Sequence, residues 1–180
     1  MTLQAKETIL VLDFGSQYSQ LIARRVREAG AFSLLVAPNE SLEKLRAHNP
    51  KGIILSGGPA SVTDAGAPVC DARLFELGVP VLGICYGMQL GCQLLGSQVG
   101  KAPAREYGRT KLHVKVAKDL LQGISSPATV WMSHGDQVTG LSNDFEMLAS
   151  TPTCPAAAVK HRTQKFWGVQ FHPEVTHTPC

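Results

Sequence analysis

The first half of the chain alternates short apolar runs with segments whose apolar residues recur at helical spacing. Apolar runs bounded by turn residues are typical of strands buried on both faces, and their alternation with helices favours a parallel sheet covered on both sides. The expected strands are 8–13, 32–37, 53–55 and a run that begins at Val79. The expected helices are one from Gln17 to a cap at Gly30, followed by 41–47, 71–77 and 88–95.

The second half is richer in strands. Residues 109–116 alternate polar and apolar side chains, as a half-exposed strand does. Further short strands are expected over 129–132, 145–149, 156–160 and 166–170. No linker, repeat or low-complexity segment divides the chain. We therefore expect residues 1–180 to form a single α/β domain, a three-layer sandwich with a mainly parallel central sheet and a strand-rich, partly antiparallel second half.

Composition excludes several classes of protein. With 44% hydrophobic residues and a mean hydropathy near zero, the chain is expected to be globular. A net charge of +3, scattered along the chain, gives no reason to expect nucleic-acid or membrane binding. The longest apolar runs stop after about six residues, and residues 1–7 lack the pattern of a signal peptide. Five irregularly spaced cysteines without a Cys-x-x-Cys pair predict neither a zinc ribbon nor a disulfide framework, so a cytoplasmic setting is expected.

Cys85 stands where an expected strand turns into an expected helix, between Gly83 and Gly87. This is the layout of a nucleophile elbow with cysteine in place of serine, and the glycines fit because a Cβ at either position would crowd the strand and the helix. Unpaired N–H groups and the helix dipole would favour the thiolate. The alternative is a buried cysteine that only packs, but such a residue needs no special backbone.

A base for this thiol is expected in the loop after the last strand. Reactive groups of open α/β sheets gather beyond the carboxyl ends of the strands, and His172 and Glu174 lie there on either side of a proline. An imidazole oriented by a carboxylate can take a proton from a thiol. The alternative for His172 is an ordinary surface histidine. His134 is a rival base, but we interpret it as a hydrogen-bonded turn histidine, because its only carboxylate neighbour in sequence is Asp136.

The Gly57-Gly58 pair offers backbone N–H groups close to a ligand, and with the N–H of Tyr86 it could form an oxyanion hole. A plain tight turn is the alternative. The segment 56–61 is not a phosphate-binding loop, because Pro59 lacks an N–H group, and no Walker A sequence is present. A metal site is not expected either. The available ligands have no known metal-binding spacing; they are His134, Asp136, His172 and His177.

Taken together, the motifs resemble those of the class I (triad) glutamine amidotransferases, in the same order and across nearly the whole chain. They are Leu12–Tyr18, Ile54–Pro59, Gly83–Gln89, Met132–Asp136 and Gly168–Thr178. The resemblance is closest to the branch that forms the glutaminase domain of GMP synthetases. It implies a flavodoxin-like fold, a Cys85–His172–Glu174 triad and an oxyanion hole from Gly58 and Tyr86. It also implies a glutamine pocket in which Gln89 contacts the amino-acid end of the substrate; Ser133, Gly135 and Asp136 line that pocket.

The resemblance further implies hydrolysis of L-glutamine to glutamate and ammonia through a cysteine thioester. The ammonia would serve an ATP pyrophosphatase (synthetase) domain or subunit, which converts XMP to GMP and alone needs ATP and Mg²⁺; no cofactor is expected in this chain. Neither that domain nor the family's closing C-terminal helix is expected within residues 1–180. The alternatives are another γ-glutamyl or cysteine hydrolase on a similar elbow, and a non-catalytic regulatory module.

Overall fold

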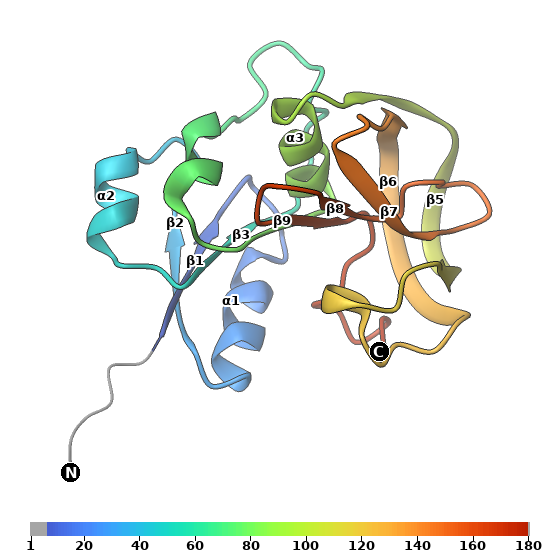
Figure 1. Cartoon of the computed structure of the whole chain (residues 1–180), viewed down its shortest axis with the longest axis horizontal. Coiled ribbons are helices and arrows are strands. Elements are labelled where there is room, and N and C mark those ends of the chain that lie inside the picture. Colours follow the sequence, from blue (N-terminus) through green and yellow to red (C-terminus); the bar gives the residue numbers. More distant parts are fainter. Residues whose placement is uncertain (1–6, 180) are drawn as a thin grey trace.

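A single mixed sheet organises the residues that the computed structural model describes, 7–179. Its nine strands follow the order β2-β1-β3-β4-β9-β8-β7-β5-β6 (Figure 1). The last strand of the chain therefore lies next to β4, in the middle of the sheet, although a long stretch of sequence separates the two. This crossover brings the end of the chain to the segment that holds Cys85.

The strands on one side of the sheet are parallel, as the apolar runs predicted. They are β1 (Thr8–Leu12), β2 (Phe32–Val36), β3 (Gly52–Leu55), β4 (Val81–Ile84) and β9 (Phe166–Val169). Because they are parallel, their carboxyl ends share one edge of the sheet. The loops that follow β1, β3, β4 and β9 carry the motifs singled out in the sequence, and the topology therefore gathers them at that edge.

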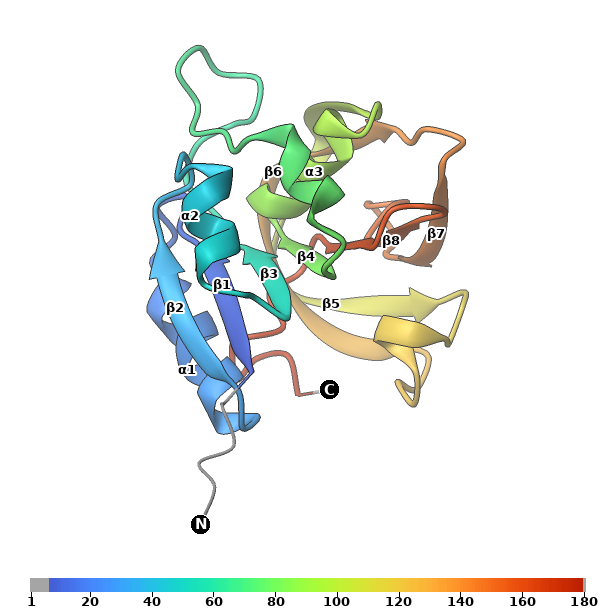
Figure 2. The same cartoon turned by 60° about the vertical axis from the view of Figure 1, so that its left-hand side comes forward.

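Helices cover both faces of the parallel half, which confirms the expected three layers. Within β1, Leu10 packs in one buried cluster with Leu45 and Met88, whereas Val11 packs in another with Ile22. One face carries α2 (Leu42–Ala47), the 3₁₀ helix η1 (Ala72–Leu77) and α3 (Tyr86–Leu94). The other carries α1 (Ser19–Glu28) and the short 3₁₀ helix η2 (Asp119–Leu121). Figure 2 shows α1 and α2 on opposite sides of β1 and β2.

The second half is antiparallel and contains longer strands than the sequence predicted. Its strands are β5 (Gln98–Val114), β6 (Ala128–Gly140), β7 (Phe145–Ser150) and β8 (Ala158–His161). The strand expected over 109–116 begins at Gln98, and the one expected over 129–132 runs on to Gly140. Residues 133–137 therefore lie inside β6 and not in a turn after it. The reason is that β5 and β6 are paired on both sides of a register shift between Lys101 and Glu106.

The α1 face also carries an apolar groove that extends across the middle of the sheet. Its lining includes Val26, Ile54, Leu82, Leu120 and Trp167. Among the described residues, no helix is both long and apolar enough to cross a membrane.

Candidate active site

Cys85 occupies a strained turn between β4 and α3. Its φ of +50° and ψ of −106° are a conformation that residues with a side chain rarely adopt. A Cβ at Gly83 would lie 2.6 Å from the carbonyl oxygen of Gly87, and a Cβ at Gly87 would lie 2.3 Å from that of Leu55. The prediction that these glycines allow strand and helix to approach is therefore confirmed. The strain falls on the cysteine itself.

His172 and Glu174 form a buried pair in the loop after β9. Nδ1 of His172 lies 2.8 Å from Oε1 of Glu174, so the second ring nitrogen is left for another partner. The backbone of His172 is fastened to β6, because its N–H donates to the carbonyl of Trp131 at 3.0 Å. The hydroxyl of Thr178 donates to the carbonyl of His172 at 2.7 Å and accepts from the N–H of Trp131 at 2.9 Å. His172 is thus held both at its ring and at its backbone.

The elbow and this pair meet across Gly57. A Cβ on Gly57 would lie 3.2 Å from Cε1 of His172 and 3.8 Å from Cβ of Cys85, and all three residues are at the same edge of the sheet. Burial lowers the pKa of His172, but hydrogen bonds to Cys85 and Glu174 together outweigh it and raise that pKa to about 10. The raised pKa corresponds to an imidazolium beside Cys85 at neutral pH. The structure thus brings together the three residues predicted as a triad.

Two backbone N–H groups beside Cys85 are free to bind a ligand. Within residues 7–179, neither Gly58 N–H nor Tyr86 N–H donates to a protein acceptor. Tyr86 opens α3, where the first N–H groups of a helix have no partner inside it. Gly58 cannot be replaced without movement, since its Cβ would lie 2.7 Å from the carbonyl oxygen of Phe14. Both residues line the cavity that contains Cys85, which is where an oxyanion hole would have to be.

That cavity has a volume of about 460 Å³ and is lined largely by polar groups. The predicted pocket residues Ser133, Gly135 and Asp136 line it from β6, and Lys101 and Arg105, which the sequence did not single out, line it from β5. Opposite charges therefore surround the cavity, as a zwitterionic amino acid requires.

Gln89 also lines this cavity, but its amide nitrogen is occupied by the protein. It donates to the carbonyl of Asp136 at 2.8 Å and to Oε1 of Gln170 at 3.1 Å. Gln170 in turn donates to Sγ of Cys85 at 3.6 Å. Gln170 was not predicted from the sequence. The available signal was its position at the end of the last strand, two residues before His172.

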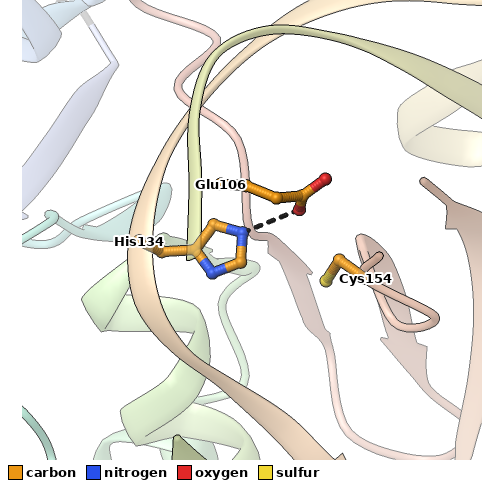
Figure 3. A group of neighbouring side chains, drawn as sticks. All are labelled: Glu106, His134 and Cys154. Atoms are coloured by element: carbon orange, nitrogen blue, oxygen red, sulfur yellow. Dashed lines mark hydrogen bonds and ion pairs between the residues drawn. The ribbon is translucent and has the colours of Figure 1, made fainter. Parts of the chain in front are cut away.

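His134 is buried in β6, and the interpretation of it as a turn histidine is wrong. Its Nε2 lies 3.0 Å from Oε2 of Glu106, a carboxylate 28 residues away on β5, and its Nδ1 donates to the carbonyl of Asp136 at 2.9 Å. Three residues, Glu106, His134 and Cys154, form the one group in the described part of the chain whose possible metal-ligand atoms all lie within 4.8 Å of one another (Figure 3). Burial raises the pKa of the Cys154 thiol to about 12, and the imidazole and carboxylate already bind each other.

Comparisons with known proteins identify the family of the chain. The family model of glutamine amidotransferase class-I matches residues 10–180. The chain is 54% identical over 173 residues to the GMP synthase [glutamine-hydrolyzing] of Acetivibrio thermocellus, covering 96% of this chain and 34% of that protein. It is 53% identical over 178 residues to the enzyme of the same name from Parasynechococcus marenigrum, covering 98% and 34%. The chain therefore spans about a third of the length of these relatives.

Two solved structures are similar as well. A putative GMP synthase subunit from Thermoplasma acidophilum superimposes with a TM-score of 0.86 at 31% identity, covering 96% of this chain and 87% of that one. A glutamine amidotransferase from Thermotoga maritima has a TM-score of 0.76 at 19% identity, covering 94% and 77%, and is similar in fold.

Proposed function

Because the chain belongs to the class-I glutamine amidotransferase family, we propose that it hydrolyses L-glutamine to glutamate and ammonia at Cys85. One observation carries the proposal. A cysteine held in a strained turn lies beside a histidine whose pKa is raised by that cysteine and by a buried glutamate. A cysteine that only packs would need neither the strain nor the charged neighbour.

In the first half of the reaction the Cys85 thiolate attacks the carboxamide carbon of glutamine. The carbonyl π bond opens and its oxygen becomes an oxyanion, which the free N–H groups of Gly58 and Tyr86 bind; each donor lowers the barrier by about 3 kcal/mol. His172, protonated at rest, gives its proton to the amide nitrogen as the C–N bond breaks. Ammonia leaves, and a γ-glutamyl thioester remains on Cys85.

In the second half His172 is neutral and accepts a proton from water, which attacks the thioester carbonyl. The C–S bond then breaks, glutamate leaves, and thiolate and imidazolium are restored. Glu174 keeps the ring in the orientation and tautomer that both halves need, because its carboxylate accepts from Nδ1. Ser133, Gly135 and Asp136 would form the wall along which the substrate lies, with Gln89 at its amino-acid end.

We further propose that the ammonia serves GMP formation. Relatives more than half identical to this chain are named GMP synthase, and about two thirds of their length lies outside the region that this chain matches. An ATP pyrophosphatase domain or subunit, with ATP and Mg²⁺ at its own site, would use the ammonia to convert XMP to GMP in purine biosynthesis. That setting is cytoplasmic.

The test is glutamine-dependent ammonia release by this chain, by itself and with a candidate ATP pyrophosphatase subunit. Cys85→Ala should abolish release from glutamine, while the complex with that variant should still make GMP from added ammonium salts. Intact glutamine hydrolysis by Cys85→Ala would refute the assignment of the nucleophile. Turnover of γ-glutamyl peptides without any partner would instead favour a hydrolase of another kind.

A further inference from the structure

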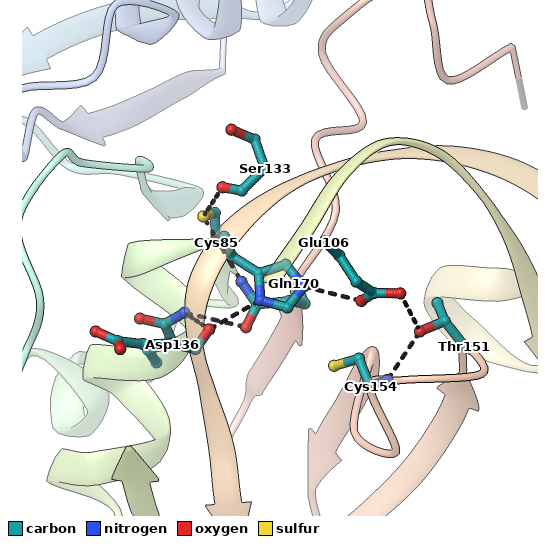
Figure 4. A network of polar contacts seen from close by, with 9 residues as sticks. Cys85, Glu106, Ser133, Asp136, Thr151, Cys154 and Gln170 are labelled. Carbon is teal, nitrogen blue, oxygen red and sulfur yellow. Dashed lines mark hydrogen bonds and ion pairs between the residues drawn. The ribbon is translucent and has the colours of Figure 1, made fainter. Parts of the chain in front are cut away.

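A chain of buried polar groups connects Cys85 to the Glu106–His134 pair at the far side of the pocket (Figure 4). It runs from the pair to the carbonyl of Asp136, then to the amide of Gln89, then to the amide of Gln170 and finally to Sγ of Cys85; we call it the relay. Gln170 is fully buried, and Gln89, His134 and Glu106 are nearly so. The proposed reaction uses neither Gln170 nor the pair.

The hydrogen-bond chemistry fixes which way each amide of the relay points. A backbone carbonyl can only accept, so Gln89 must present its NH₂ group to Asp136. The same nitrogen lies 3.1 Å from Gln170, which must therefore present its oxygen to Gln89. The nitrogen of Gln170 is consequently left facing Sγ at 3.6 Å. Reversing Gln170 would set two NH₂ groups against each other.

The donor matters because the sulfur has, besides the imidazole of His172, a polar neighbour with the opposite effect. The carbonyl of Ser133 lies 3.7 Å from Sγ and can only accept, so it favours the protonated thiol. The NH₂ of Gln170 can only donate, so it favours the thiolate, and hydrogen bonds to a charged atom are the stronger kind. Without Gln170, the sulfur would keep the Ser133 carbonyl, which opposes its ionisation, and the imidazolium of His172 would have to favour the thiolate without this second donor.

The Glu106–His134 pair holds the far end of the relay. The ring nitrogen Nδ1 of His134 must carry a proton, because its partner is a carbonyl, and the bond between Nε2 and Glu106 then contains one shared proton. The other carboxyl oxygen of Glu106 accepts from the hydroxyl of Thr151 at 2.9 Å, and that hydroxyl accepts from the N–H of Cys154 at 2.9 Å. Ring and carboxylate are thus fixed from both sides, and with them the carbonyl of Asp136.

We propose that Gln170 donates a hydrogen bond to the reacting sulfur of Cys85, and that the Glu106–His134 pair acts through Asp136 and Gln89 as a positioning device for that donor. The inference rests on the proposed function, since it concerns the same nucleophile. It can nevertheless be measured without glutamine, because the pH dependence of alkylation by a small electrophile reports the fraction of Cys85 that is present as thiolate. A failure of glutamine hydrolysis and a failure of the relay are therefore separate outcomes.

The first experiment follows alkylation by iodoacetamide against pH in a Cys180→Ser background, with Cys85→Ala as the blank. Burial raises the pKa values of the Cys70, Cys92 and Cys154 thiols, whereas Cys85 lines the cavity, so Cys85 provides the signal. Gln170→Met should move the alkylation profile to higher pH by about one unit. At a fixed pH below the midpoint, the alkylation rate should then be about tenfold lower. The matched control is Gln137→Met, a buried glutamine of β6 outside the relay, which should leave the profile in place.

The second experiment separates positioning from mere packing. Glu106→Gln can donate to Nε2 of His134 and accept from Thr151, so its profile should match that of the unmodified chain. Glu106→Leu fills similar space without either bond and should slow alkylation about threefold or more in the direction seen for Gln170→Met. Circular dichroism verifies folding; if Glu106→Leu does not fold, Gln89→Leu cuts the relay at its middle and should give the same shift.

With glutamine as substrate, Gln170→Met should lower kcat about tenfold and leave KM within about twofold, because the bond acts on the sulfur and not on substrate binding. An alkylation profile of Gln170→Met that coincides with that of Gln137→Met would overturn the proposal. So would a Glu106→Gln variant as slow as Glu106→Leu, since the hydrogen bonds would then not be what the pair contributes.

Discussion

Oε1 of Glu174 lies 2.8 Å from Nδ1 of His172, and both side chains are almost fully buried. The contact is made between residues only two apart, across Pro173, whose ring limits how the loop can relax. A short bond in a stiff loop fixes the plane of the imidazole, and the remaining ring nitrogen can then act on Cys85. The orientation of the base is therefore a local property of the His-Pro-Glu sequence.

Replacing Glu174 should test that orientation directly. Glu174→Gln can present an N–H group to Nδ1, which would favour the wrong tautomer, and we expect kcat for glutamine to fall about a thousandfold with little change in KM. The matched control is Glu43→Gln, an exposed glutamate at the start of α2, which should leave both constants unchanged. An active Glu174→Gln enzyme would remove the carboxylate from the mechanism.

The raised pKa of His172 makes a prediction about stability and pH. The folded chain holds this proton more tightly than the unfolded chain, since the pKa rises from 6.5 to about 10 on folding. The resulting stabilisation is fully present below the unfolded value and is lost as the pH rises through the folded value. In urea unfolding, the free energy of unfolding of His172→Gln should therefore fall further below that of the unmodified chain at pH 6.5 than at pH 10.

His48→Gln serves as the control for that series, because His48 is exposed at the end of α2 and its substitution should cost little at either pH. A deficit for His172→Gln that grows between the two pH values would contradict the account, because the proton would then be bound less tightly in the folded chain.

The elbow glycines should resist substitution. A Cβ at Gly87 would lie 2.3 Å from the backbone of Leu55, which cannot move without disturbing β3, so Gly87→Ala should lower the free energy of unfolding by about 3 kcal/mol or prevent folding. Gly100→Ala is the matched control, because its Cβ would meet its nearest neighbour at 3.5 Å; its effect should stay within about 1 kcal/mol. Equal losses in the two variants, measured by urea unfolding, would show that crowding is not what requires glycine at the elbow.

Thr178 should matter more than a threonine in a loop usually does. Its hydroxyl connects the buried carbonyl of His172 to the partly buried N–H of Trp131, so Thr178→Val leaves both backbone groups without this partner. We expect a loss of about 2 kcal/mol in unfolding free energy and about a tenfold lower kcat, because the catalytic loop is less firmly held. Thr176→Val, two residues away and exposed, should change neither quantity. A Thr178→Val variant with wild-type kcat would remove the hydroxyl from the account.

Local pattern was sufficient for the parallel half of the fold and for the elbow. The runs at Thr8–Leu12 and Val81–Ile84 are apolar almost throughout because helices cover both faces, and that burial is visible in the sequence. Cys85 with its flanking glycines, and His172 with Glu174, are each contained within a few residues. Their chemistry could therefore be inferred before their positions in space were known.

The long strands β5 and β6 and the relay could not be inferred in that way. The parts of β5 and β6 that lie outside the expected ranges contain Lys, Arg, Gly and Pro, and they pair mainly with each other. Their sequence therefore lacks the apolar alternation of a covered strand. Glu106 meets His134 across 28 residues, and Gln170 meets Cys85 across 85. No local spacing encodes such pairings, because only the strand order brings them together.

The most direct test of the central claim uses a glutamine analogue that carries an electrophilic carbon in place of the carboxamide, followed by peptide mass spectrometry. We predict one adduct per chain, on Cys85, formed more slowly when glutamine competes and absent from Cys85→Ala. A chain that releases ammonia from glutamine while the analogue labels another residue, or none, would contradict the assignment of Cys85 as the nucleophile.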